Sequence, residues 1–400
     1  MKNTTGELAS YDPRIDTQLD RILDEFGLVA CGWSADWDPA LRAAIERCKG
    51  RRFTTFWATV GELSSSAADL VALRGATVLR IQGADNLFSN LEANLRSLEE
   101  AKKPHPLSVA AAVGSVKRYI ADDKDRIRLN DLFLDVSTDL QRKLSSASFS
   151  PDPQPRDGTT LSSYVPRYDA ETDILTSMLT TATRWAESRH YKILVDTIER
   201  IGAQPRDLGG LTAFLRLRRY PAMRLVYASG LTALAVGHYK TLYTILTAPR
   251  VERKRDEYGA PVLSLYDSAV VEQAGWLSPL FNGSTLHVPV SEHLYGTLRG
   301  YLSDTLTHYD DYERIFDKFE YIYALVYASL RGRGWVPMGR LTYRFYDSRQ
   351  WGPLKELEEE IATHGADWPL LQAGLCDGSH AKFIELKQRV DEFMSQNTRF

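Results

Sequence analysis

The chain has 400 residues, a formal net charge of -3 and 44% hydrophobic residues. This length accommodates more than one domain, and the small net charge argues against a general nucleic-acid binder. The three cysteines, Cys31, Cys48 and Cys376, lie far apart and form no Cys-x-x-Cys pair, which argues against a zinc site built on paired cysteines.

The first 100 residues alternate between amphipathic helices and short apolar strands. Three segments rich in apolar and β-branched residues are predicted strands: residues 28–31, 52–58 and 77–81. Four segments are predicted helices: residues 15–26, 39–48, 64–74 and 85–100. Strands that alternate with helices form parallel sheets with right-handed crossovers. We therefore expect an α/β domain at residues 1–104, built on a partial, three-stranded, Rossmann-like parallel sheet.

Helix-terminal residues support the boundaries of these helices. Pro39 lies in the first turn of the second helix, where its missing N–H costs nothing. Gly75 follows the third helix and is typical of a helix C-terminus. Asp85 is well placed as the N-cap of the fourth helix.

Helical periodicity dominates after residue 104. We expect a helical extension at residues 105–144, a Ser/Pro-rich linker at 145–167 and an α-helical domain at 168–400. The predicted helices are residues 107–122, 127–144, 174–188, 192–201, 211–219, 222–236, 239–246, 293–307, 312–331, 354–364 and 381–394. The most apolar long segment, residues 222–237, contains Arg224 and is shorter than a membrane span, so we expect a core helix there.

A polar loop between the first strand and the second helix carries the candidate site. Ligands of open α/β sheets bind beyond the carboxyl ends of the strands, which is where Ser34, Asp36 and Asp38 lie. Asp38 has an equally good interpretation as the N-cap of the helix that Pro39 opens. Ser34 could also serve a Ser-His-Asp hydrolase with a distant histidine such as His105, but no Gly-x-Ser-x-Gly nucleophile elbow supports that alternative.

Several segments in order along the chain resemble sirtuin-like domains. The run Cys31-Gly32-Trp33-Ser34-Ala35-Asp36-Trp37-Asp38-Pro39-Ala40-Leu41 resembles the Gly-x-Ser-x-x-(x)-Asp loop in the second half of those domains. Residues 2–15 resemble the stretch before that strand, and residues 51–57 and 81–88 resemble the next two strands and their exits. The resemblance is closest to bacterial sirtuin-like proteins with helical C-terminal domains, several of which consume NAD in anti-phage defence.

This resemblance implies NAD as the cofactor, bound at the strand exits. Seven residues would line the site: Gly32, Trp33, Ser34, Asp36, Asp38, Ala84 and Asp85. The first five belong to the loop that would hold the ribose and phosphates, with Asp36 or Asp38 bracing it. Ala84 and Asp85 would lie near the adenine end.

The resemblance supplies no catalytic residue. Cleavage of the nicotinamide–ribose bond needs a Gly-rich phosphate loop, an Asn or Asp, and a His that accepts a proton near neutral pH. In the family these groups come from the half of the domain before the Gly-Trp-Ser strand, and no histidine precedes His105 here. Residues 1–26 also hold no cysteine for the family's zinc module. We therefore expect the catalytic half to lie outside this chain, and the chain alone not to hydrolyse NAD.

The alternative is a non-enzymatic binding or assembly module. Its tyrosine-rich helical domain would bind an oligomeric ATPase or a second copy of the chain, and we expect an oligomer or such a partner. Scattered cysteines and the lack of a cationic, apolar leader favour a cytoplasmic protein without a membrane segment.

Two groups of residues have a structural and a functional interpretation. Trp33, Trp37 and Trp57 could stack on a base or a partner, but such residues more often fill a core or a subunit interface.

Two basic clusters could contact phosphate, although solvated helix faces explain them more simply. They are Arg216, Arg218, Arg219 and Arg224, and Arg250, Arg253, Lys254 and Arg255. A metal site at His287 and His293 lacks carboxylate support in the sequence.

Overall fold

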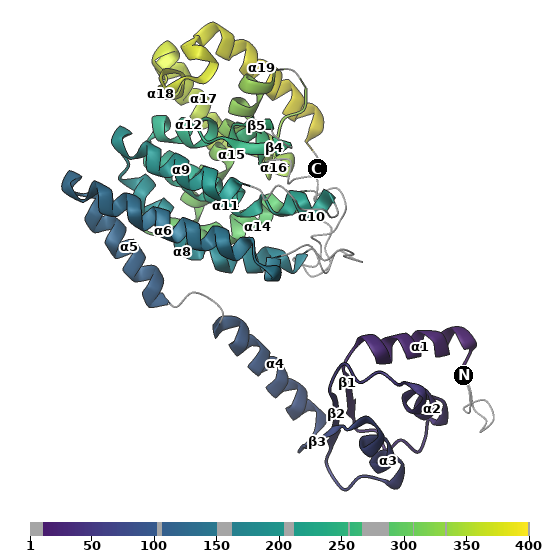
Figure 1. Ribbon diagram of the computed structural model, residues 1–400. Coiled ribbons are helices and arrows are strands. Elements are labelled where there is room, and N and C mark those ends of the chain that lie inside the picture. Colours follow the sequence, from purple (N-terminus) through teal and green to yellow (C-terminus); the bar gives the residue numbers. More distant parts are fainter. Residues whose placement is uncertain are drawn as a thin grey trace. The chain divides into compact units, whose positions relative to one another are not determined.

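The computed structural model describes residues 11–101, 106–149, 162–203, 212–254, 257–265, 288–306, 308–332 and 334–398. The chain divides into two compact units, Met1–Lys102 and Lys103–Phe400. The first unit holds a small parallel sheet and the second is almost entirely helical (Figure 1). The predicted fold class, a partial α/β unit followed by a helical domain, is confirmed.

The first unit is a three-stranded sheet with helices between its strands. In chain order its elements are α1 (Pro13–Glu25), β1 (Leu28–Cys31), α2 (Pro39–Arg47), β2 (Thr55–Thr59), α3 (Ser65–Arg74), β3 (Thr77–Arg80) and α4 (Ala84–Ala101). The strands lie in the order β1-β2-β3 and both pairs are parallel. Ala30 pairs with Trp57, and Trp57 pairs with Val78. The carboxyl ends of all three strands therefore meet at one edge.

Among the described residues, α1, α2 and α3 cover one face of this sheet. Consecutive strands joined by right-handed crossovers place their helices on the same side, and Figure 1 shows α1, α2 and α3 together beside the strands. Ala30 and Trp57 point to that side and pack with Ile45 of α2 and Leu70 of α3. On the other face Val29 is 48% exposed. The face that carries Val29 is thus not covered by α1, α2 or α3.

Capping side chains set the helix starts in the first unit. The Asp12 carboxylate accepts from the N–H of Arg14, and the Ser64 hydroxyl accepts from the N–H of Ala67 at 3.1 Å. Gly75 has φ +60 and closes α3, as its place in the sequence predicts. The predicted N-cap at Asp85 is wrong. Helix α4 begins one residue earlier, because the Gly83 carbonyl accepts its first helical hydrogen bond.

The second unit is a helical bundle with one short hairpin. Its α-helices are α5 (Pro106–Ile120), α6 (Arg126–Leu144), α8 (Tyr164–Arg184), α9 (Tyr191–Gly202), α10 (Thr212–Leu217), α11 (Tyr220–Ala235), α12 (Tyr239–Thr247), α13 (Pro261–Ser264), α14 (Pro289–Leu298), α15 (Tyr309–Arg331), α16 (Leu341–Trp351), α17 (Pro353–His364), α18 (Pro369–Ala373) and α19 (His380–Asn397). The hairpin joins β4 (Val251–Lys254) and β5 (Glu257–Gly259). Every residue from Tyr220 to Leu234 is buried, so α11 is the central core helix that its apolar sequence predicts.

The start of one helix in the second unit differs from expectation. Helix α8 begins at Tyr164, inside the range expected to be linker, and residues 150–161 of that range lie outside the described residues. Within α8 the hydroxyls of Thr172 and Thr176 donate to the carbonyls four residues back. Among the described residues, the structure offers no helix that combines the length and the apolar character needed to cross a bilayer.

Candidate functional site

The predicted loop lies at the carboxyl end of β1 and is held in a tight path. Gly32 has φ +68, a left-handed conformation that glycine adopts freely. Ala35 has φ +64 and is 1% exposed, so its methyl group packs in the core of the first unit. A non-glycine residue in this conformation is uncommon and shows that the surrounding contacts fix the loop.

Asp38 is a capping residue. Its Oδ1 accepts from the Leu41 N–H at 2.9 Å, and its Oδ2 accepts from the Tyr11 hydroxyl at 2.5 Å. Partial burial, together with the hydrogen bond to this carboxylate, raises the pKa of Tyr11 to about 12. Both carboxylate oxygens are engaged within the protein. The capping interpretation of Asp38 is therefore the one that the geometry supports.

Ser34 joins this loop to the start of α3. Its hydroxyl accepts from the Asp36 N–H at 3.3 Å, and its carbonyl accepts from the Ser64 hydroxyl at 2.5 Å. The same Ser64 hydroxyl caps α3 through the N–H of Ala67. The loops after β1 and after β2 are thus tied together at the strand-exit edge. The carboxylate of Asp36 is exposed there.

The three tryptophans of the first unit divide into two kinds. Trp33 stacks on Trp57 with ring centroids 5.6 Å apart and planes at 23°, and Trp57 is 1% exposed. Trp33 therefore packs against the core. Trp37 is 84% exposed and stands beside Asp36 in the loop. The structural interpretation holds for Trp33 and Trp57, whereas Trp37 presents its indole to solvent.

Ala84 and Asp85 lie at a separate part of the same edge. Both are exposed and follow β3, which is two strands away from β1. Neighbouring strands lie about 4.8 Å apart, so this exit and the loop after β1 are separated by about 10 Å. A ligand that contacts both groups must extend across the end of β2.

Two side chains that could act as nucleophiles, the free thiol of Cys31 and the hydroxyl of Ser34, lie at the end of β1 and in the loop, without a histidine of the same unit. The sequence has no histidine among residues 1–104, so the loop has no imidazole of its own unit to activate Ser34. Among the described residues no group of three or more His, Cys, Asp or Glu side chains could hold a metal ion. The loop offers an exposed carboxylate, a hydroxyl and an indole, which are binding groups.

A buried polar cluster in the second unit is absent from the predicted site. Arg224 of α11 is 2% exposed, and its Nη1 lies 2.9 Å from Oδ1 of Asp169 in α8. Nε2 of His293 in α14 lies 2.6 Å from Oδ2 of Asp169, and the Tyr220 hydroxyl donates to Oδ1 at 2.6 Å. Burial alone would raise the pKa of Asp169, but the hydrogen bond from His293 and the charge of Arg224 outweigh it and lower that pKa. The cluster joins α8, α11 and α14 around the ionised carboxylate of Asp169.

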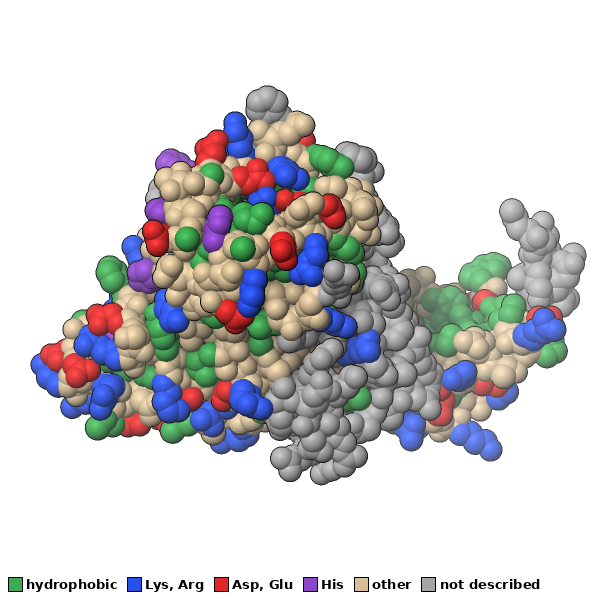
Figure 2. Space-filling view, turned by 90° about the horizontal axis from the view of Figure 1, so that it is seen from above, with side chains coloured by type: hydrophobic (Ala, Val, Ile, Leu, Met, Phe, Trp, Pro, Cys, Tyr) green, Lys and Arg blue, Asp and Glu red, His purple; other side chains and the backbone are tan. Residues whose placement is uncertain are grey.

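The expectation of a solvated basic face is wrong for Arg224 and Arg218. Arg224 also donates to the hydroxyls of Thr297 and Tyr301, at 2.9 Å and 3.0 Å. Arg218 is 8% exposed and donates to backbone carbonyls. A single arginine inside the most apolar helix is the signal that could have found this cluster, because a buried charge needs a partner. Over the face of the second unit seen in Figure 2, basic and acidic side chains are interspersed.

A second buried cluster surrounds Glu320 of α15. Its Oε1 accepts from the Ser291 hydroxyl at 2.5 Å and its Oε2 accepts from the Arg340 N–H at 2.7 Å. Burial raises the pKa of Glu320 to about 8, against the opposing effect of the Ser291 hydrogen bond. The Arg340 guanidinium lies over the Tyr295 ring, 3.4 Å from its centroid. This cluster fixes the segment before α16 to α14 and α15.

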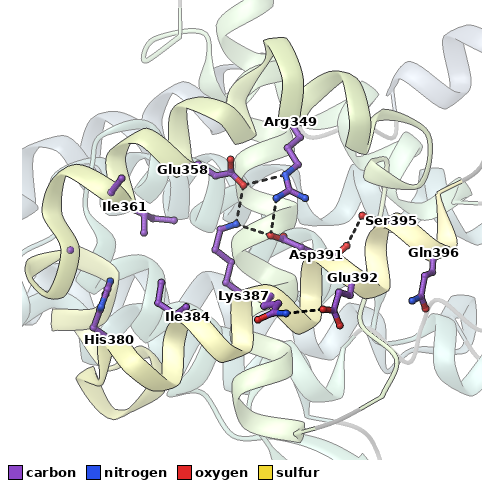
Figure 3. A pocket seen from close by; sticks show the side chains of 13 residues that line it. Arg349, Glu358, Ile361, His380, Ile384, Lys387, Asp391, Glu392, Ser395 and Gln396 are labelled. Carbon is purple, nitrogen blue, oxygen red and sulfur yellow. Dashed lines mark hydrogen bonds and ion pairs between the residues drawn. The ribbon is translucent and has the colours of Figure 1, made fainter.

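The second unit also carries an open groove of about 820 Å³ between α17 and α19 (Figure 3). Four charged side chains meet in its middle: Arg349, Glu358, Lys387 and Asp391. This volume falls within the range of ligand pockets in proteins. The groove has no local signal in the sequence, because its walls come from helices separated by turns and by α18.

Comparisons of this chain with protein-family models, with curated proteins and with solved structures find no match. The sirtuin-like family therefore stays a prediction from the sequence segments.

Proposed function

We propose that the first unit supplies one part of a dinucleotide-binding site of the sirtuin-like type, and that this chain by itself does not cleave NAD. The observation that supports it is the loop at the carboxyl end of β1. Gly32 turns the chain there, Ser64 pins the loop through the Ser34 carbonyl, and the Asp36 carboxylate is left exposed.

Each of these groups has a part in the proposed binding. An exposed carboxylate can accept hydrogen bonds from the two hydroxyls of a ribose, as acidic residues do in dinucleotide sites. The exposed Trp37 indole can pack against a base or a sugar face. Asp38 takes no direct part, because its two oxygens cap α2 and accept from Tyr11. The second exit at Ala84 and Asp85 would contact the other end of the ligand.

Binding and cleavage are tested separately. NMR titration of the full chain with ADP-ribose should shift resonances of the loop, and Asp36→Ala should weaken the effect. Asp69→Ala, which removes an exposed carboxylate from α3, is the matched control and should bind like the parent protein. Incubation with NAD should release no nicotinamide at an enzyme-like rate. Equal binding by both variants would refute the assigned role of Asp36, and rapid nicotinamide release would refute the absence of catalysis.

A second candidate function is assembly with another copy of the chain. Parallel sheets are usually covered on both faces, and here the face that carries Val29, Phe56 and Leu79 has no helix of α1–α3 on it. Size-exclusion chromatography with light scattering should show a dimer or larger species. Val29→Lys should dissociate it, whereas Val60→Lys, at another exposed valine of the same unit, should not. A monomeric parent protein would exclude this candidate.

A further inference from the structure

One stripe of α19 lines the groove along nearly the whole helix. The lining residues recur at His380, Ile384, Gln388, Asp391 and Ser395, which is the three- and four-residue spacing of a single helix face. At a rise of 1.5 Å per residue, this stripe is about 22 Å long. Helix α17 forms the opposite wall (Figure 3). The groove is thus long and has one helix along each side, a shape that can receive another helix.

The charges in the middle of the groove neutralise one another. Nζ of Lys387 lies 2.9 Å from Oε1 of Glu358 and 2.7 Å from Oδ2 of Asp391. Arg349 lies 3.3 Å from the same glutamate and 3.5 Å from the same aspartate. Asp391 also accepts from the buried Tyr321 hydroxyl at 2.5 Å. Two cations and two carboxylates thus form a closed ring, which leaves no excess charge at the centre.

The two ends of the groove differ in chemistry. Ile361, Ala362 and Ile384 make one end apolar, and Ile384 is 46% exposed. Glu392 lies at the other end, where its Oε1 accepts from the Gln388 amide at 3.0 Å and no cation of the ring is bonded to it. With the ring neutral, Glu392 gives the lining a net charge of about -1 at neutral pH. The groove therefore offers an apolar contact and a carboxylate about two helical turns apart.

We propose that this groove binds a basic amphipathic helix of a partner protein. An apolar side chain of that helix would enter between Ile361 and Ile384, and a lysine or arginine two turns along would pair with Glu392. Charge complementarity selects a basic partner, because the ion-pair ring leaves Glu392 as the unneutralised carboxylate among the described residues that line the groove. The length of the stripe favours a helix over a compact ligand. This inference does not depend on nucleotide binding by the first unit.

The test is fluorescence anisotropy with the full chain and a labelled synthetic peptide. The probe is a helical peptide with leucines at three- and four-residue spacing and lysines beside them, and its twin has glutamate in place of each lysine. The lysine peptide should bind saturably and the glutamate peptide should not. Ile384→Glu and Glu392→Lys should each weaken binding by about tenfold or more, as hot-spot substitutions do.

Matched controls separate binding from folding. Glu385→Lys makes the same charge change as Glu392→Lys on the same helix, outside the lining, and Ile127→Glu changes an isoleucine of α6 that is 70% exposed. Both controls should bind the lysine peptide like the parent protein. Circular dichroism melts should show all four variants folded. Absence of binding, equal binding of the two peptides, or equal weakening by the groove variants and the controls would overturn the proposal.

Discussion

The two units of this chain differ in the partners of their buried charged side chains. In the first unit Arg74 is buried and donates to the backbone carbonyls of Cys48 and Gly50. Most other described charges of this unit lie nearer the surface, such as Arg47, which lies 2.8 Å from Asp20. The second unit pairs the buried Arg224 with the partly buried carboxylate of Asp169 between helices. Exposed pairs contribute little to stability, whereas a broken buried pair leaves an uncompensated charge. A charged pair therefore joins helices of the second unit, whereas the buried arginine of the first unit is held by backbone carbonyls.

The sharpest test of this contrast removes one arginine from each unit. Arg224→Met should lower the free energy of unfolding of the second unit by about 3–5 kcal/mol, because it leaves the partly buried Asp169 beside fewer donors. Arg47→Met should cost the first unit far less, since its partners remain hydrated. Urea unfolding followed by hydrogen exchange in each unit measures both. A similar cost for the two variants would contradict the contrast.

Two glycines with positive φ extend the comparison to the backbone. Gly339 has φ +53, and a Cβ there would overlap the Glu320 carboxylate, so Gly339→Ala should cost about 2–3 kcal/mol. Gly75 has φ +60 with open space around it, so Gly75→Ala should cost only the backbone strain of about 1 kcal/mol. Thermal unfolding of the two variants provides the measurement. A larger loss of stability in Gly75→Ala than in Gly339→Ala would contradict this expectation.

The buried Glu320 predicts a pH dependence specific to the second unit. The folded chain keeps the Glu320 proton up to a pKa of about 8, whereas the unfolded chain releases it near 4.5. Between these values the unfolded state binds fewer protons, so the free energy of unfolding falls by about 1.4 kcal/mol for each unit that pH rises. Glu320→Gln should remove this slope in urea titrations across that window. Parallel pH profiles of the variant and the parent protein would argue against it.

The smallest expected effect separates the two aspartates of the loop. Asp38→Ala should destabilise the first unit by about 1 kcal/mol, because it removes the cap of α2. Asp36→Ala should change stability by less than about 0.5 kcal/mol, because its carboxylate is exposed. Chemical denaturation of both proteins decides the matter. A larger loss with Asp36→Ala would reverse the assignment of binding and capping roles.

Local sequence signals predicted the first unit well. Residues 28–31 form β1 as expected, and Pro39 opens α2 with Asp38 as its cap. These features depend on neighbours within a few positions, so their cause is visible in the sequence. Asp85 is not the N-cap of α4, because the Gly83 carbonyl accepts the first helical hydrogen bond. The carbonyl of any residue can do this, so the sequence gives no signal for it.

The buried clusters of the second unit could not be derived in the same way. Asp169 and His293 are separated by 124 positions and meet only because α8 and α14 pack together. The run of arginines that includes Arg224 predicts a basic surface, whereas the structure buries Tyr220–Leu234 of α11 on every side. The groove along α19 likewise depends on the placement of α17. The Asp169–His293 contact, the burial of Arg224 and the groove all depend on packing between residues far apart in the sequence, which helical periodicity does not predict.

We propose that the strand-exit edge of the first unit binds a dinucleotide without cleaving it, and hydrogen–deuterium exchange with and without ADP-ribose is the decisive measurement. We expect slower exchange in peptides that cover residues 28–38 and 81–85, and unchanged exchange throughout the second unit. Unchanged exchange at these two exits, with protection elsewhere or nowhere, would contradict it.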